Sequence, residues 1–257
     1  MVDQSDWGQI VVRGTDRVRF VQGLVTNDVA VVAQGGWCRA AVLSVKGRVL
    51  AVVNVVVEAD ALVVLTEAVT AEKVSAHLER HAIADDVVFE RGARPLHRLW
   101  HSVGDVWSAP PLFAPPPRTS SPQELAAIEV LRLEAGLPRY GVDVDEDRFP
   151  FEAGLDREIS FTKGCYAGQE VVARAHARGQ ANWRLVGLRL DGTEPAAPGS
   201  ILSSPARADA GRVTSSGVSP RLGPIALAYV HRSSWEPGTT VSIAGRAAVV
   251  VTLPMGA

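Results

Sequence analysis

The stretch Lys163-Gly164-Cys165-Tyr166-Ala167-Gly168-Gln169-Glu170 combines a thiol, two glycines and an ammonium group, and Val171-Val172-Ala173-Arg174 follows it with a guanidinium group. From Gly168 onward, Gln169, Val172, Ala173 and His176 are spaced as on one face of a helix. We therefore predict that Cys165 lies in a loop just before the first helical turn. Lys163 and the helix amides would stabilise a thiolate there. A buried, inert cysteine in a glycine turn is the alternative.

Composition predicts a globular protein with a sizeable core. The chain has 257 residues, of which 47% are hydrophobic, and a formal net charge of −2. This length fits one large domain or two to three small ones. No apolar run approaches the ~18 residues of a membrane helix, and residues 1–6 lack the basic start of a secretory signal. With Cys38 and Cys165 too few for a disulfide framework, we expect a cytoplasmic protein without membrane contact.

The N-terminal half predicts a compact α+β unit. Thr15 is expected to cap a short helix that exits near residues 26–28. Composition and turn residues then predict three strands, a helix and a further strand, at 38–45, 49–57, 61–66, 69–83 and 87–90. Such a unit forms an open sheet that a helix covers on one face.

The C-terminal half begins with a segment rich in proline and serine, residues 108–122, which predicts a linker. Ser121-Pro122-Gln123-Glu124 supplies a cap, a proline at the first helical position and an acidic third residue, so a helix should run from there to Gly136. After Trp183 the chain has four short β-rich runs separated by Gly and Pro, at 184–190, 211–215, 225–231 and 241–251. They predict a terminal β-barrel or sandwich.

Several segments together resemble a known family, the YgfZ-like folate-binding proteins, which are relatives of the glycine-cleavage T-protein (aminomethyltransferase). The motif at 163–170 is similar to the family's signature, residues 21–29 resemble its N-terminal segment, and Lys46-Gly47-Arg48 matches one of its turns. Residues 131–141 and 151–155 look like segments shared with the T-protein.

The resemblance implies an α+β fold of three subdomains around a central folate-binding opening. Residues 1–44 plus 119–182 would form the folate-binding core, residues 45–118 a ferredoxin-like part, and residues 183–257 a β-barrel.

The resemblance also implies a tetrahydrofolate-binding protein that supports iron–sulfur cluster assembly or repair in client enzymes, including those that thiolate tRNA. Cys165, with Lys163, would be its functional thiol. A folate has a flat pterin with polar edges and a glutamate tail, so its site needs oriented polar groups, a ring contact and a cation. Candidates for the polar edge are Asn27, Glu152, Gln169 and Glu170; for the ring, Tyr166 or Trp183; for the carboxylates, Lys163, Arg174 or Arg178. Lys46 in the matched turn completes the set.

Other roles stay open for these residues. Gln169 and Glu170 would serve equally as helix caps, and Arg174 and Arg178 as a solvated face. The T-protein carries an aspartate just after the region of Gly47, where this chain has the apolar run 49–53, which argues against aminomethyl transfer.

A folate-dependent one-carbon transferase or demethylase is nevertheless the alternative function, with Glu152 or Asp156 as its acid or base. Whether the protein is an enzyme therefore stays open. Direct tRNA binding through Arg174, Arg178 and Arg184 has thin support, since no aromatic residues alternate with these cations. No set of metal ligands is expected.

Overall fold

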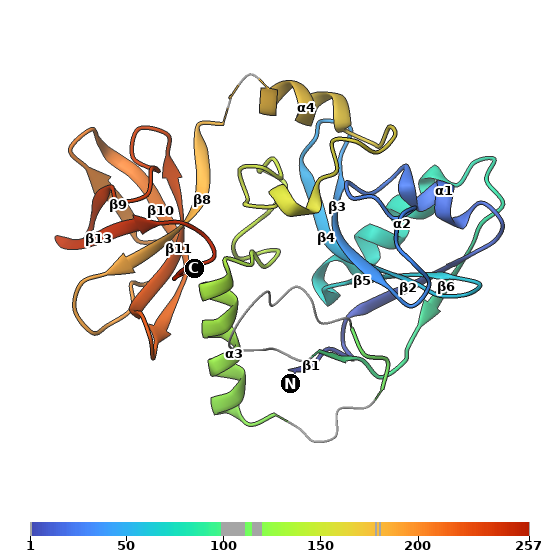
Figure 1. The fold of residues 1–257 in the computed structure, drawn as a ribbon, viewed down its shortest axis with the longest axis horizontal. Coiled ribbons are helices and arrows are strands. Elements are labelled where there is room, and N and C mark those ends of the chain that lie inside the picture. Colours follow the sequence, from blue (N-terminus) through green and yellow to red (C-terminus); the bar gives the residue numbers. More distant parts are fainter. Residues whose placement is uncertain (1, 99–110, 115–119, 178, 180, 257) are drawn as a thin grey trace.

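A five-stranded sheet and a closed β-barrel form the two ends of the molecule, and helix α3 (Pro122–Ala135) stands between them (Figure 1). The computed structural model describes residues 2–98, 111–114, 120–177, 179 and 181–256. None of the helices in these ranges is long and apolar enough to span a bilayer.

The sheet pairs its strands antiparallel in the order β3-β4-β5-β2-β6. The strands are β2 (Gly8–Arg13), β3 (Trp37–Leu43), β4 (Val49–Val57), β5 (Leu62–Thr66) and β6 (Val88–Gly92). With helices α1 (Arg17–Gln22) and α2 (Ala71–His81), the order β4-β5-β2-β6 is that of a ferredoxin-like unit, and β3 extends its edge. This unit takes strands from both sides of residue 44, where the first subdomain was expected to end. The division into 1–44 plus 119–182, 45–118 and 183–257 stays a prediction.

The two faces of the sheet have different coverings. Alternate side chains of a strand point to opposite faces, and on β4 Val53 and Val55 pack in one buried cluster with Phe20 of α1 and Leu78 of α2. Val52 instead packs with residues of the 140–175 segment. A ligand site on the sheet therefore has to lie on the face of Val52.

One expectation for this half needs correction, and one pair of strands was not predicted. Thr15 does not cap α1, because the residue before the helix is Asp16, which makes no side-chain cap bond. The Thr15 hydroxyl instead donates to the Asp86 carboxylate at 2.7 Å. The sequence also gave no sign of β1 (Val2–Asp3) and β7 (His97–Arg98), two-residue strands that pair with each other.

The predicted helix start at Ser121 is confirmed in detail. Ser121 Oγ accepts from the Glu124 N–H at 3.2 Å, and Glu124 Oε2 accepts from the Ser121 N–H at 2.8 Å. The helix ends at Ala135, where Gly136 adopts φ 71°, a conformation that favours glycine. Helix α4 (Gln169–Ala177) also begins where the motif predicted.

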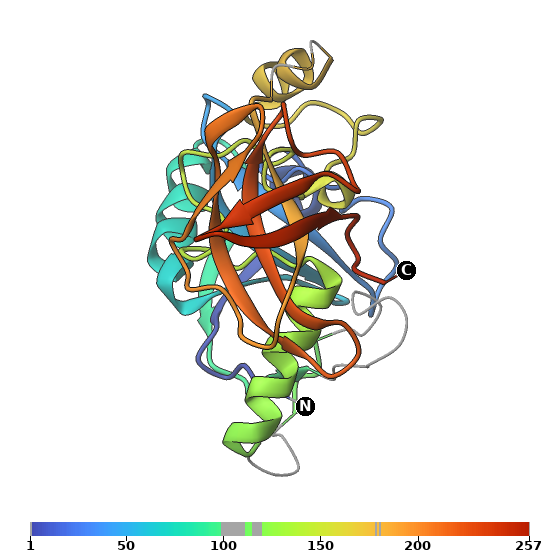
Figure 2. The same cartoon turned by 90° about the vertical axis from the view of Figure 1, so that its left-hand side faces the viewer.

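The C-terminal strands close into a six-stranded barrel, seen from its own side in Figure 2. They are β8 (Trp183–Leu190), β9 (Ile201–Ser204), β10 (Arg207–Ser219), β11 (Gly223–His231), β12 (Thr240–Ile243) and β13 (Arg246–Val251). The run 241–251 is thus two strands, because the chain turns at Ala244-Gly245 with positive φ at both residues. The predicted terminal barrel is confirmed.

A buried polar network fastens α3 to the barrel. Arg132 donates to Asp143 at 2.7 Å and to the Ser215 hydroxyl of β10 at 3.0 Å. Ser215 donates to Asp143 at 2.6 Å, and Asp143 is only 1% exposed. Since each of these side chains is partnered within the network, the barrel is held in a fixed position beside α3.

Candidate functional site

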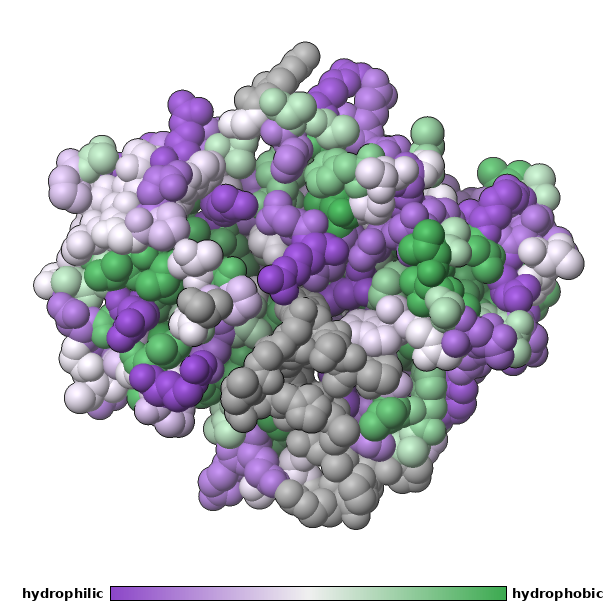
Figure 3. Space-filling view, in the orientation of Figure 1, coloured by the Kyte–Doolittle hydropathy of each residue, from purple (hydrophilic) through white to green (hydrophobic). Residues whose placement is uncertain are grey.

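A central cavity of about 630 Å³ lies on the Val52 face of the sheet. Small-molecule sites commonly measure ~300–1,000 Å³. The cavity is bordered by β3, β4, β7, α3 and the segments 4–7, 67–69 and 137–139. Figure 3 shows hydrophilic residues gathered between the sheet and the barrel. The fold therefore provides a concave space at the meeting of its parts.

The lining of the cavity changes from apolar to polar. Trp7, Val69, Leu125 and Ile128 supply apolar surface, and Val69 and Leu125 are well exposed. The buried Asn54 comes from the same face of β4 as Val52. A ligand with a flat apolar body and a polar end matches such a lining.

The charged groups of the cavity are mainly guanidinium groups. Arg132 and Arg139 share Glu129, at 2.7 and 3.6 Å. Arg39 donates to the Pro138 carbonyl at 3.2 Å and lies 3.5 Å from Glu158. These three arginines therefore have acidic or carbonyl partners.

Glu67 supplies the cavity with a carboxyl group from just beyond β5. Burial raises the pKa of Glu67, opposed by the N–H of Tyr140 and by nearby arginines. The Tyr140 N–H donates to Glu67 Oε1 at 3.3 Å. A carboxyl with a raised pKa, lying in a cleft, is suited to proton transfer.

Three buried side chains of the lining have polar atoms that find no hydrogen-bond partner within the described part of the chain. These atoms are Nε and Nη2 of Arg98, Oδ1 of Asn54 and Oε1 of Gln4. Exposure is 7%, 2% and 7% for these residues. Buried polar groups are nearly always bonded, so a cluster of exceptions around one cavity points to a polar ligand.

Lys163 does not face this cavity. Its ammonium group donates to the carbonyl oxygens of Gln22, Val25 and Asn27 at 2.6, 2.7 and 2.9 Å. Burial lowers the pKa of Lys163 to about 8, opposed by Asp28 and Cys38. All three donors of the ammonium are in use, so Lys163 fastens the motif to the end of α1.

The motif glycine Gly168 permits a close approach to the predicted Lys46-Gly47-Arg48 turn. It has φ +80°, and a Cβ there would lie 2.5 Å from the Ser44 carbonyl oxygen. Lys46 itself is exposed. Cys165 is exposed in the loop before α4, as the motif predicted. The signature thus joins α1, the β3–β4 turn and α4.

The structure brings only some of the predicted site residues together. Asn27, Lys163 and Tyr166 form one group, since the Lys163 ammonium also lies 5.1 Å from the Tyr166 ring centre. On α4, Glu170 and Arg174 pair with each other on an exposed face. Neither these residues nor Gln169 lines the central cavity in the part of the chain that the structure describes.

The remaining candidates lie near the barrel. Glu152 is buried, accepts from the Phe149 N–H at 3.1 Å and lies 3.7 Å from Arg48. Trp183 begins β8 and lines a different cavity of about 440 Å³. Arg178 is outside the described residues. The folate roles of all these residues stay predictions.

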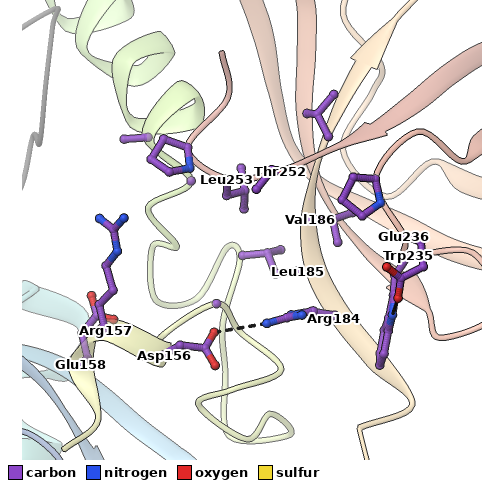
Figure 4. A pocket seen from close by; sticks show the side chains of 16 residues that line it. Asp156, Arg157, Glu158, Arg184, Leu185, Val186, Trp235, Glu236, Thr252 and Leu253 are labelled. Atoms are coloured by element: carbon purple, nitrogen blue, oxygen red, sulfur yellow. Dashed lines mark hydrogen bonds and ion pairs between the residues drawn. The ribbon is translucent and has the colours of Figure 1, made fainter. Parts of the chain in front are cut away.

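A second cavity, of about 480 Å³, separates residues 154–158 from the barrel (Figure 4). Asp156 and Arg184 face each other there at 3.7 Å, and Trp235 donates to Glu236 at 2.9 Å. Among its described lining residues, none has a buried side-chain polar atom that lacks a hydrogen bond. The central cavity is therefore the better candidate for a ligand.

Sequence reasoning missed Gln4, Asn54, Glu67 and Arg98. Asn54 did carry a signal, because it is the one polar residue in the apolar strand 49–57. Arg98 carried none, since its place in the cavity depends on the short β1–β7 pairing.

Comparison with known proteins relates the fold to one group. Residues 184–255 match the family model of the glycine cleavage T-protein C-terminal barrel domain. The glycine cleavage system aminomethyltransferase T from Bartonella henselae has the same fold, with a TM-score of 0.80 and 21% identity over 98% of this chain and 85% of that chain.

Sequence relatives carry the same name. An aminomethyltransferase from Saccharopolyspora erythraea is 40% identical over 48% of this chain and 34% of its own length. Another, from Rubrobacter xylanophilus, is 29% identical over 99% of this chain and 82% of its own length. The first of these matches thus spans about a third of the relative. The chain is T-protein-like in fold and sequence.

Proposed function

We propose that the protein binds a tetrahydrofolate in the central cavity and takes part in one-carbon group transfer. The observation that carries this proposal is a cluster of buried polar atoms around a partly apolar cavity, in a T-protein-like fold, and these atoms have no partner among the residues described. The relatives' name, aminomethyltransferase, supports transfer chemistry. The apolar run at 49–53 argued against transfer only because it lacks the single aspartate that the T-protein carries in this region.

The lining fits a reduced folate by its chemistry. Apolar surface from Trp7, Val52 and Leu125 suits the flat rings, while Arg98 and Asn54 offer donors and acceptors to polar groups. When bound, a tetrahydrofolate supplies nitrogen atoms that carry or accept the one-carbon group.

Glu67 takes the role of acid or base in this proposal. The strand that holds the run 49–53 presents Val52 to the cavity, so a carboxyl group has to come from another element. Glu67 comes from the end of β5, and burial raises its pKa. A carboxyl group with a pKa moved towards neutrality exchanges protons more readily at physiological pH. In the described lining, Glu67 therefore replaces Glu152 and Asp156 as the candidate.

Titration with tetrahydrofolate under reducing conditions tests the binding, by calorimetry and by thermal shift. A ligand at 100 times its Kd stabilises the folded state by about 2.7 kcal/mol, which for a chain of this size raises Tm by about 5 °C or more. Asn54→Leu should reduce the shift, whereas Asn182→Leu, outside the cavity, should not. Absence of any shift or heat with the wild-type protein would refute the proposal.

Transfer is tested separately, by following methylene-tetrahydrofolate formation from donor amines. Glu67→Gln should lower the rate about 100-fold or more while tetrahydrofolate still binds. Glu170→Gln, on the exposed face of α4, is the matched control. An unchanged rate in Glu67→Gln would remove Glu67 from the chemistry.

Iron–sulfur cluster assembly or repair in client enzymes, the YgfZ-like function, is the second candidate. The exposed Cys165 within its signature motif favours it. Rescue of client-enzyme activity in a deletion strain is the measurement: full rescue by Cys165→Ala would remove the thiol from the mechanism. Direct binding of tRNA stays a weaker hypothesis.

A further inference from the structure

Arg98 presents an unused binding edge to the central cavity. Among the residues that the structure describes, its Nε and Nη2 atoms have no hydrogen-bond partner, and Arg98 is 7% exposed. These two nitrogens lie on one edge of the guanidinium, the edge that binds a carboxylate with two parallel hydrogen bonds. No ion pair is formed by Arg98 within the described residues. A buried cation left in this state is costly unless a ligand anion joins it.

The surroundings of Arg98 increase the need for an anion. Its guanidinium lies 5.1 Å from the ring centre of Trp37, which fixes the group in place. Burial, together with the positive charge of Arg39, lowers the pKa of Arg98 to about 10. Arg39 has Glu158 as its ion-pair partner. The excess positive charge is thus at Arg98.

Two buried acceptors line the same cavity. Gln4 follows β1, whose Val2 is the register partner of Arg98, and the Gln4 N–H donates to the Leu96 carbonyl at 2.8 Å. Asn54 on β4 is the register partner of Arg39 on the adjacent strand β3. Gln4 Oε1 and Asn54 Oδ1 have no hydrogen-bond partner in the described ranges, so the cavity offers a carboxylate site together with acceptors for N–H groups.

We propose that Arg98, Gln4 and Asn54 bind an α-carboxylate whose neighbouring carbon carries an N–H group. This deepens the proposed function and rests on it for the identity of the ligand. Two sources have this chemistry: the glutamyl end of the folate, which has an amide N–H, and a free N-methylated amino acid acting as one-carbon donor.

Calorimetry with four probes distinguishes these sources: tetrahydrofolate, 6-methyltetrahydropterin, N-(4-aminobenzoyl)glutamate and sarcosine. Arg98→Met should weaken the probe that uses the site about 30-fold or more, and Arg98→Lys should recover little of this because it lacks the paired nitrogens. Arg189→Met, on an exposed position of β8, is the matched control.

The pattern of losses identifies the source. Weaker binding of tetrahydrofolate and aminobenzoylglutamate, with 6-methyltetrahydropterin unchanged, assigns the site to the glutamyl end. A loss confined to sarcosine assigns it to a separate donor. If Arg98→Met alters none of the probes that the wild-type protein binds, the proposal is overturned while tetrahydrofolate binding stands. If tetrahydrofolate fails to bind but aminobenzoylglutamate binds through Arg98, the proposed function fails and the carboxylate site stands.

A ligand-side comparison keeps the test independent of how the variants fold. Wild-type protein is titrated with aminobenzoylglutamate and with its α-amide, which lacks the α-carboxylate charge, and with sarcosine and its amide. In at least one of the two pairs, the acid should bind more tightly than its amide, by a factor of about 30 or more. Equal affinity within both pairs, or no binding of either acid, would overturn the proposal.

Discussion

Replacing Lys163 by methionine should destabilise the protein strongly, because the ammonium group holds three backbone carbonyls. The bond to Val25 is buried, and those to Gln22 and Asn27 are partly buried. Loss of a buried partner costs about 1–3 kcal/mol, and a partly buried hydrogen bond contributes about 0.5–1.5 kcal/mol. We therefore expect the free energy of unfolding to fall by about 2–6 kcal/mol.

Urea denaturation at pH 7 measures this change, and Lys46→Met is the matched control. Lys46 is exposed in the turn beside α4, so its loss should change stability by no more than about 0.5 kcal/mol. The experiment distinguishes a structural role of Lys163 from the ligand-binding role predicted from the sequence. If Lys163→Met were as stable as the wild-type protein and lost tetrahydrofolate affinity, the ammonium would serve the ligand and our structural account of it would be wrong.

Three further predictions concern other parts of the fold. Arg132→Met leaves the buried Asp143 without its cation, so denaturation should show a loss of about 3–5 kcal/mol; a loss below about 1 kcal/mol would mean that the network does not fasten the barrel. Gly168→Ala should lower Tm clearly, because Gly168 has φ +80° and a Cβ there would lie 2.5 Å from a backbone oxygen. Gly164→Ala is the control and should not lower Tm, because the space around Gly164 is open. Equal Tm values for the two variants would contradict this. Since burial raises the folded-state pKa of Glu67 above 4.5, wild-type stability should fall relative to Glu67→Gln as pH rises from 4.5 through that value; a stability difference that does not change with pH would contradict it.

Local signals predicted much of the fold. The Ser121–Glu124 pattern located the start of α3 because a capping box depends only on residues within one turn. Strand β4 matched its predicted range, 49–57, because a long apolar run between turns is unambiguous. The prediction that Thr15 caps α1 was wrong because the Thr15 hydroxyl bonds to Asp86, a partner distant in sequence.

The candidate cavity was harder to predict, because its polar groups come from elements that are distant in sequence. Arg98 reaches it through a two-residue strand pair, which leaves almost no trace in composition. Lys163 was predicted from its neighbours to act on Cys165 or a ligand, yet its partners are carbonyls near α1. Charge and spacing drew attention to Lys163 but did not indicate the direction of its side chain.

The attachment of α3 to the barrel has a consequence for protein engineering and for evolution by domain shuffling. Leu133 of α3 is fully buried against Leu185, Ile225 and Leu227, which face outward from the barrel. Produced alone, residues 183–257 would expose this apolar patch to water and should self-associate. A transplantable version of the barrel has to include α3, or replace the patch with polar residues.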